Sequence, residues 1–278
     1  MKSINLVLSG GGIKGVAHIG ALKYLEENNY KLNAVSGCSS GSIMAVLIAV
    51  GYSSSQIYNL VKYYINIVSN NKLRLGIQSI FGLNRKMGLN NGNIIENIMN
   101  NVLKEKNITN LAEIKIPIYI PTVDINTGKL IYFTNQKNYK RKYDNNIEYI
   151  YDGKIAEIVR ASCSYPGIFA PKKYDKYLLI DGGIRENTPV TPLINISKDN
   201  TLAIIFSNSK KVQINNIFEV ITQSFDILSH DNNYESAKMA EKILEIELNN
   251  VKLLDFSKLE YVYNEGYKQS KEKLKYLI

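Results

Sequence analysis

Near the N-terminus, short continuous apolar runs alternate with apolar residues at helical spacing. Residues 4–8 are almost all apolar, which is typical of a parallel strand buried on both faces. Over 16–25 the apolar positions recur every three or four residues, so this stretch is predicted to be a helix. A second strand core at 34–35 and a helix over 42–50 repeat the same order. This repetition of strand and helix predicts an α/β protein.

The rest of the chain continues the alternation until about residue 210. The pattern predicts helices over 56–68 and 93–103, and strands over 116–123, 130–133, 177–180 and 201–206. From about residue 215 the chain is expected to be largely helical, and it closes with a lysine-rich amphipathic helix over about 261–276. Strands that alternate with helices imply a mostly parallel sheet with helices on both faces.

The domain organisation is predicted to be simple. The chain has 278 residues, 45% of them hydrophobic, and no Pro/Gly/Ser-rich linker divides it. We therefore expect one domain over 1–278, with a motif-bearing core at about 4–206 and a helical C-terminal part at about 210–278. The N-terminal apolar stretch is too short for a signal peptide and no apolar run could span a bilayer, so a cytoplasmic location is expected.

Charge and cysteine content exclude several classes of function. The net charge is +9, which favours anionic partners such as lipid headgroups. The basic residues form no block and no stripe with aromatic residues, so nucleic-acid binding is not predicted. Cys38 and Cys163 provide neither a disulfide framework nor zinc spacing, and we interpret them as small buried side chains. No metal and no cofactor is predicted.

The turn after the second strand carries the candidate nucleophile. Gly37-Cys38-Ser39-Ser40-Gly41 fits the Gly-x-Ser-x-Gly pattern of a nucleophile elbow, in which a strained turn between strand and helix exposes the central hydroxyl. Ser39 is that central residue. The alternative is an ordinary tight turn with a helix-capping serine.

The turn after the first strand is the glycine run Gly10-Gly11-Gly12-Ile13-Lys14-Gly15. One interpretation is an oxyanion hole, in which the N–H groups of this loop, helped by that of Ser40, bind the developing negative oxygen. The run also matches the Gly-x-Gly-x-x-Gly pattern of dinucleotide-binding oxidoreductases. That pattern predicts an acidic residue at the end of the second strand, where Ser36 and Gly37 stand instead, so this alternative ranks second.

A serine nucleophile needs a base, and Asp181 is the leading candidate. Asp181-Gly182-Gly183 follows a predicted strand, so its turn joins the two glycine-rich turns at one sheet edge if the three strands are parallel neighbours. Acting alone, the carboxylate would need burial to raise its pKa. A Ser39–Asp181–His230 triad has the chain order of an α/β-hydrolase, although only one strand precedes Ser39. His18, on the first helix, is predicted to be a packing residue.

In this order the motifs resemble the patatin-like phospholipases, which are calcium-independent lipid acyl hydrolases. The resemblance covers most of residues 4–206 and rests on the motifs at 10–15, 37–41 and 181–183 and on the segments at 123–128, 161–169 and 187–190. It implies a three-layer α/β/α patatin-like fold, with Ser39 as nucleophile, Asp181 as base, and Gly10, Gly11 and Gly12 forming the oxyanion hole. No histidine, metal or cofactor is needed in such a dyad.

The expected function is therefore a serine lipid acyl hydrolase that cleaves fatty acyl esters of phospholipids or related lipids. A soluble esterase, thioesterase or acyltransferase on the same scaffold is the nearest alternative, and a silent lipid-binding module is a further one. The segment 70–91 is apolar with interleaved basic residues. It is a candidate lid or site of peripheral membrane contact, or else a plain surface helix hairpin. Headgroup, acyl length and oligomeric state stay open.

Overall fold

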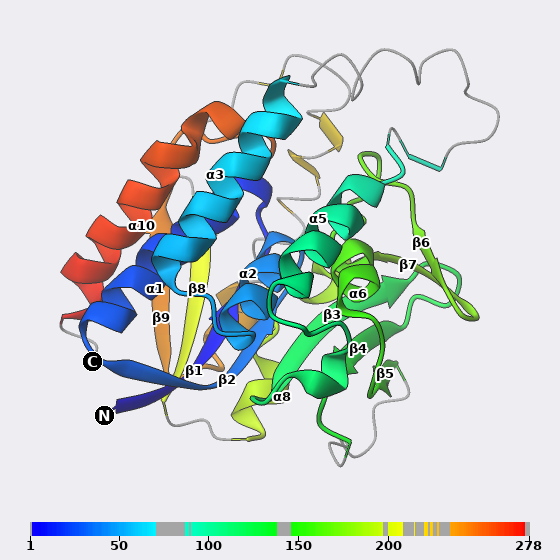
Figure 1. Cartoon of the computed structure of the whole chain (residues 1–278), viewed down its shortest axis with the longest axis horizontal. Helices are drawn as coiled ribbons and strands as arrows, with labels where there is room; N and C mark the ends of the chain where they lie inside the picture. The colour runs from blue at the N-terminus through cyan, green and yellow to red at the C-terminus, as the bar shows by residue number, and fades with distance from the viewer. Residues whose placement is uncertain are drawn as a thin grey trace.

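One sheet of nine strands organises the part of the chain that the structure describes (Figure 1). The structure, a computed structural model, describes residues 2–70, 87–88, 90–137, 146–196, 200–207 and 234–275, with a few residues between 214 and 227. The strand order is β5-β4-β3-β2-β1-β8-β9, and β7, which pairs with β6, also pairs with β3. The strands are β1 (Lys2–Leu8), β2 (Tyr30–Gly37), β3 (Ile118–Asp124), β4 (Leu130–Thr134), β5 (Ile147–Ile150), β6 (Lys172–Tyr174), β7 (Tyr177–Asp181), β8 (Thr201–Ser207) and β9 (Lys242–Glu247).

The sheet is mostly parallel, as the alternation of strands and helices predicts. Strand β1 runs parallel to both its neighbours, β2 and β8, and the pairs β2–β3, β4–β5 and β8–β9 are parallel as well. Antiparallel pairing is confined to β3 with β4, β3 with β7, and β6 with β7. The predicted α/β fold class is thus confirmed.

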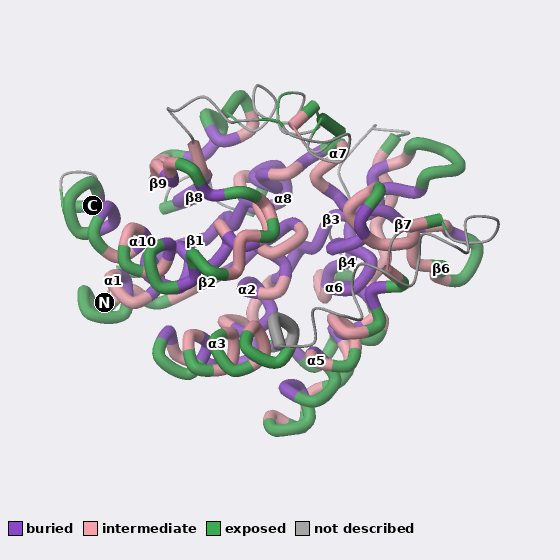
Figure 2. The backbone as a smooth tube through the Cα atoms, turned by 90° about the horizontal axis from the view of Figure 1, so that it is seen from above, coloured by how far each residue is buried: buried purple, intermediate pink, exposed green. Residues whose placement is uncertain are grey.

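Helices cover both faces of the sheet, and β1 shows how its side chains divide between them. Leu6 and Leu8 point into the larger core, whereas Val7 points into a second core on the opposite face. The buried strands run through the middle of the molecule (Figure 2). The larger core is packed by α1 (Ala17–Glu27), α2 (Ser40–Ala49), α3 (Ser54–Asn70), α5 (Asn93–Lys104), α6 (Ile155–Ser162) and α10 (Leu259–Leu274), and the second core by α7 (Gly183–Glu186) and α8 (Thr191–Ile194).

The C-terminal part differs from the prediction that it is largely helical. Residues 242–247 form β9, an edge strand parallel to β8, so the same sheet continues beyond residue 210. Leu244 and Ile246 are buried on one side of this strand, and the other side carries Ile243, Glu245 and Glu247. Charges so close to one another resemble the polar face of a helix, which hid the two-residue period. The closing helix itself is confirmed as α10.

Two sequence-based expectations fall mainly outside the described residues. Of the candidate lid at 70–91, the structure describes Met87, Gly88, Asn90 and Asn91 and the backbone of Asn70. His230, the third member of the alternative triad, is not among the described residues. Within the described ranges, no helix has the length and apolar character needed to cross a bilayer.

Candidate active site

The two predicted catalytic residues come together because β2 and β7 approach each other end to end along one edge of β3. Ser36 of β2 pairs with Tyr119, and Asp181 of β7 pairs with Thr122, three residues further along β3. Strand β2 is parallel to β3 and β7 is antiparallel, so their carboxyl ends face each other across a short gap. Strand β7 does not meet the condition of three parallel neighbours, yet the predicted turns converge.

The backbone at Ser39 has the strained conformation of a nucleophile elbow. Its φ of 51° and ψ of −124° lie in a region that residues with a side chain rarely occupy. The flanking glycines permit the sharp turn, because a Cβ on Gly37 would lie 2.2 Å from the Gly41 carbonyl oxygen and one on Gly41 would lie 2.2 Å from that of Leu8. Ser39 caps helix α2 with its backbone and stays half-buried. Backbone strain held by close packing is often found at active sites, so this geometry is compatible with the predicted role of Ser39.

This strain predicts a measurable stability difference between two variants. Ser39→Gly relieves the unfavourable backbone conformation, whereas Ser39→Ala keeps it, and both remove the hydroxyl. Ser39→Gly is expected to be more stable than Ser39→Ala by about 1 kcal/mol, because relief of the strain outweighs the greater chain entropy of glycine. Urea unfolding of the two proteins side by side measures this difference, and an equal or lower stability of the glycine variant would contradict a strained elbow.

Asp181 is a buried carboxylate with few hydrogen-bond donors. Its side chain is 2% exposed, and Oδ1 accepts from the Gly183 N–H at 2.8 Å and from the Cys38 thiol at 3.6 Å. No described group donates a well-formed hydrogen bond to Oδ2. Burial raises the pKa of Asp181 to about 6, against the lowering effect of Gly183, Ser39 and Cys38. This is the tuning that a lone aspartate base requires.

The glycine loop lies against the elbow, but its three N–H groups are not equivalent. A Cβ built on Gly10 would lie 3.0 Å from the Ser39 Cβ, so this loop packs closely against Ser39. The Gly10 N–H donates to the Asn187 carbonyl at 3.2 Å, and the Asn187 amide donates back to the Gly10 carbonyl at 3.3 Å. Gly10 is therefore not a free donor, and its predicted place in the oxyanion hole does not fit this geometry.

Three other predicted donors keep their N–H groups available. Among the described residues, no backbone carbonyl accepts from Gly11, Gly12 or Ser40. Gly12 opens a short 3-10 helix (Gly12–Val16) and Ser40 opens α2, so both N–H groups belong to the unpaired first turn of a helix. Anions bind at such positions because the local backbone dipoles favour negative charge.

The end of α6 and the turn after it hold the backbones of both candidate catalytic residues, a role that the sequence reasoning missed. The Ser39 N–H donates to the Ser162 hydroxyl at 3.1 Å, and this hydroxyl donates onward to the Pro121 carbonyl at 2.9 Å. The Asp181 N–H donates to the Ser164 carbonyl at 3.1 Å. Residues 162–164 lie within the segment 161–169 that supports the family resemblance. Their residue types, Ser-Cys-Ser, do not by themselves indicate that they position other residues.

His18 fits the predicted packing role. Its Nε2 lies 2.9 Å from the Ser9 carbonyl oxygen, and its ring contacts that of Phe206 at 4.7 Å between centroids. Burial lowers the pKa of His18 to about 4, so the ring is neutral at pH 7. Cys38 and Cys163 are buried free thiols whose pKa values burial raises, in line with the predicted role as small core residues. No cluster of metal-ligating side chains occurs within the described part of the chain.

Comparison with known protein families agrees with this geometry. The family model of the patatin-like phospholipases matches residues 6–194, which include the glycine loop, the elbow and the Asp181 turn. The chain belongs to the patatin-like phospholipase family. Membership supports lipid hydrolase activity, and the match extends through most of the sheet.

Proteins similar to this patatin-like chain include viral and bacterial ones. It is 28% identical to the protein YqhO of Bacillus subtilis over 91% of this chain and 90% of that one. It is 31% identical to the probable lipid hydrolase 463L of Invertebrate iridescent virus 6, over 66% of this chain and 61% of that one. VipD from Legionella pneumophila shares the fold, with a TM-score of 0.53 and 16% identity over 98% of this chain, which spans 66% of VipD.

Proposed function

We propose that this patatin-like protein is a serine hydrolase of fatty acyl esters, with phospholipids or related lipids as substrates. The observation that carries the proposal is the left-handed backbone of Ser39 beside the buried Asp181 carboxylate. A strained serine next to a carboxylate of raised pKa serves nucleophilic catalysis, and neither feature helps the fold. The family and the viral relative called a probable lipid hydrolase support a lipid substrate.

The proposed reaction runs in two steps. Ser39 Oγ attacks the ester carbonyl carbon while Asp181 takes the hydroxyl proton, and the N–H groups of Gly11, Gly12 and Ser40 bind the oxyanion. The tetrahedral intermediate then collapses, and the leaving alcohol takes the proton from Asp181. In the second step water gives a proton to Asp181 and attacks the acyl-enzyme. The fatty acid leaves, and the proton returns to Ser39. Each oxyanion donor is worth about 3 kcal/mol in reactions of this class.

The pKa of Asp181 predicts how the rate changes with pH. A base acts only when ionised, so the rate should rise as pH increases through the pKa of about 6 and level off above about pH 7. A group that keeps the ordinary aspartate pKa would instead give full activity at pH 5. Initial rates of hydrolysis of a short ester between pH 4 and pH 9, with protein stability checked at each pH, measure this rise of the rate with pH. A rate that is flat down to pH 5 would contradict base catalysis by a buried Asp181.

Incubation with defined lipids tests the substrate class. Phosphatidylcholine and phosphatidylglycerol vesicles, with p-nitrophenyl butyrate as a soluble ester, are incubated with the wild-type chain and with Ser39→Ala. Mass spectrometry is expected to detect fatty acids released from the vesicles by the wild-type chain and none released by Ser39→Ala. Hydrolysis of the soluble ester without any release from lipid would favour the soluble esterase, and transfer to added lysophospholipid would favour the acyltransferase.

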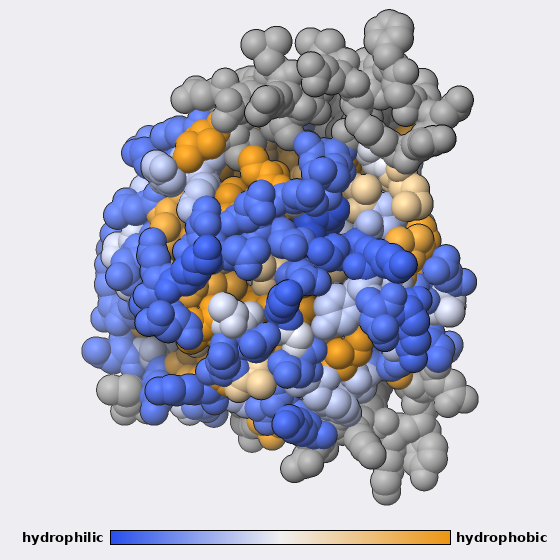
Figure 3. Space-filling view, turned by 45° about the vertical axis from the view of Figure 1, so that its right-hand side comes forward, coloured by the Kyte–Doolittle hydropathy of each residue, from blue (hydrophilic) through white to orange (hydrophobic). Residues whose placement is uncertain are grey.

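Peripheral contact with a membrane surface belongs to the same proposal. The net charge of +9 draws the chain toward anionic lipid. The face drawn in Figure 3 adds no broad apolar surface, because its hydrophobic residues form separate patches among hydrophilic ones. Co-sedimentation with phosphatidylglycerol vesicles at low and high salt is the test. Binding that salt abolishes is expected, and no binding at low salt would contradict membrane contact.

A further inference from the structure

Arg160, near the end of α6, is a buried cation that none of the described carboxylates neutralises through an ion pair. Its residue is 1% exposed, and burial lowers the pKa of its guanidinium, partly offset by the charge of Glu96. Taking a charge out of water without an ion pair is costly, so such a group persists only where its hydrogen bonds compensate. Its place in the fold therefore calls for an explanation.

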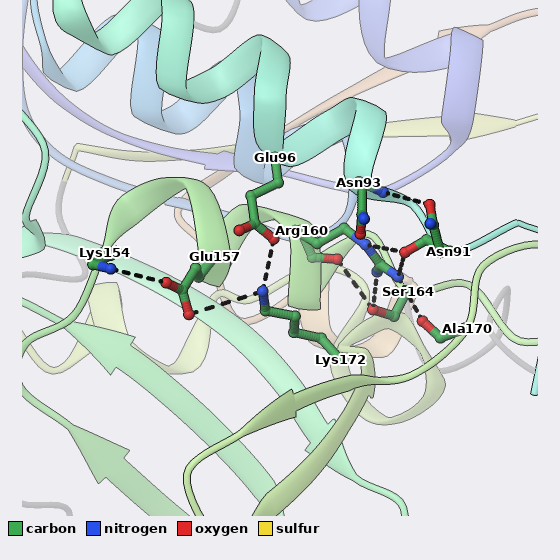
Figure 4. A network of polar contacts seen from close by, with 9 residues as sticks. All are labelled: Asn91, Asn93, Glu96, Lys154, Glu157, Arg160, Ser164, Ala170 and Lys172. Carbon is green, nitrogen blue, oxygen red and sulfur yellow. Dashed lines mark hydrogen bonds and ion pairs between the residues drawn. The ribbon is translucent and has the colours of Figure 1, made fainter.

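The guanidinium donates to three acceptors that lie on separate parts of the chain (Figure 4). Nε donates to the Asn91 carbonyl at 3.0 Å, and Nη2 donates to the same oxygen and, at 2.7 Å, to the Ala170 carbonyl. Nη1 donates to the Ser164 hydroxyl at 2.5 Å, and this hydroxyl donates back to the Arg160 carbonyl. A planar fork of donors suits such a junction, and a single ammonium does not.

One of these acceptors connects Arg160 to the catalytic residues. Ser164 holds the Asp181 N–H with its carbonyl, and Ser162, two residues earlier, holds the Ser39 N–H. The Ala170 N–H donates to the Asn90 carbonyl, and the Asn90 N–H donates to the Ile168 carbonyl. The guanidinium therefore joins residues 90–91, residues 168–170 and the turn at 162–164. The turn at 162–164 accepts hydrogen bonds from the backbones of both catalytic residues, and the Arg160 side chain in turn donates to this turn.

We propose that Arg160 is a positioning residue for acyl transfer: through Ser164 and the turn at 162–164, it holds the Ser39 and Asp181 backbones at reacting distance. The inference rests on the proposed function. Arg160 itself touches neither catalytic side chain, so the effect is on geometry. Misplacement of reacting groups by about 1 Å costs roughly 100-fold in rate.

The neighbouring ion-pair cluster provides a matched control. Lys172 pairs with Glu96 at 2.7 Å and with Glu157 at 3.8 Å, and so joins β6 to α5 and α6 (Figure 4). Like Arg160 it is a cation at this junction, but its hydrogen bond and ion pairs within the described residues go to Glu96 and Glu157 and not to residues 162–164. Lys172→Met therefore removes a charge and some stability from the same region without loosening the catalytic turn.

The experiment measures phosphonylation of Ser39 by a fluorophosphonate probe under saturating conditions, in which Ser39 Oγ attacks phosphorus and fluoride leaves, as an indicator of how well the attack on an ester is positioned. Arg160→Met is expected to lower the maximal labelling rate roughly 100-fold, with the half-saturating probe concentration within about 3-fold of wild type. Arg160→Lys, which keeps the charge but not the fork, should lose roughly 10-fold. Lys172→Met should stay within about 3-fold of wild type. A purely structural role would reduce the fraction of protein that labels, and leave the rate of the folded fraction unchanged.

The outcomes separate this inference from the proposed function. If the wild-type chain labels at Ser39 and folded Arg160→Met labels at the same maximal rate, the positioning role is wrong and the function stands. If the wild-type chain fails to label, both are overturned. Should Arg160→Met not fold, Arg160→Lys and Ser164→Ala decide, because Ser164→Ala removes the hydroxyl that links Arg160 to the turn and keeps the Ser164 carbonyl that accepts from the Asp181 N–H. Each is expected to lose roughly 10-fold, and unchanged rates in both would overturn the inference.

Discussion

Ser39→Ala is expected to lower ester hydrolysis by roughly 10⁵-fold, the largest effect of any single substitution in this chain. The variant keeps the strained elbow and its neighbours but has no nucleophile, so only binding and oxyanion stabilisation remain. Steady-state hydrolysis of a short ester by purified wild-type and variant proteins measures the loss. Circular dichroism establishes that the variant is folded.

Ser36→Ala is the matched control for Ser39→Ala. Ser36 lies three residues before the nucleophile, is fully buried, and donates to the Pro189 carbonyl at 2.6 Å. Its loss leaves one buried acceptor unpaired and costs about 1 to 3 kcal/mol of stability, but removes no reacting group. Activity within about 10-fold of wild type is expected. A comparable collapse of activity in both variants, with both folded, would remove Ser39 from its assigned role.

Asp181→Asn is expected to lower hydrolysis by roughly 10³-fold to 10⁴-fold while it stabilises the folded chain above pH 6. The amide cannot accept the proton of Ser39, so catalysis fails whether the aspartate acts alone or with His230. Stability moves the other way, because ionisation of a buried carboxylate opposes folding. Loss of function combined with a gain in stability is typical of a residue kept for chemistry.

The direction of the pH effect follows from the raised pKa. Burial raises the pKa of Asp181 from 3.8 to about 6, so the folded state holds its proton more tightly than the unfolded state. The stability that the folded state gains from binding this proton more tightly is fully present below about pH 4, and it is lost as pH rises through about 6. The amide that Asp181→Asn introduces does not titrate. The variant should therefore match wild type near pH 4 and exceed it by roughly 2 kcal/mol at pH 8.

Urea unfolding of wild type and Asp181→Asn at pH 5 and pH 8 measures that difference. Asp152→Asn is a suitable control, because Asp152 lies at the surface, where its carboxylate accepts from the Gly153 N–H. The difference in stability between the Asp152→Asn variant and wild type should change little between the two pH values. A stability gap for Asp181→Asn that does not grow with pH would contradict a carboxylate with a raised pKa.

Most of the sheet could be predicted from the chain because its strands are locally patterned. Residues 4–8 and 201–206 are almost entirely apolar, and both form central parallel strands. The direction of β7 could not be predicted in the same way, because a five-residue strand carries no signal for which neighbour it joins. Strand β9 was missed for a different reason, since its charged residues mask the alternation of Leu244 and Ile246.

For the candidate site too, the features set by local sequence could be predicted and those set by contacts between distant residues could not. Ser39 and Asp181 stand in motifs whose residue types carry chemistry, so they could be named from the sequence, and their roles stay predictions. The binding of the Gly10 N–H to Asn187 could not be foreseen, because it joins backbone atoms far apart in the chain. The same holds for Arg160, whose acceptors are two backbone carbonyls and a hydroxyl rather than an acidic partner.

Labelling of the intact chain with a fluorophosphonate probe, followed by peptide mass spectrometry, tests the central claim most directly. The account predicts one adduct, on Ser39, that is absent from heat-denatured protein and forms more slowly below pH 6, where Asp181 holds its proton. An adduct on another residue, or no adduct on folded protein with and without detergent, would contradict the assignment of Ser39 as an activated nucleophile.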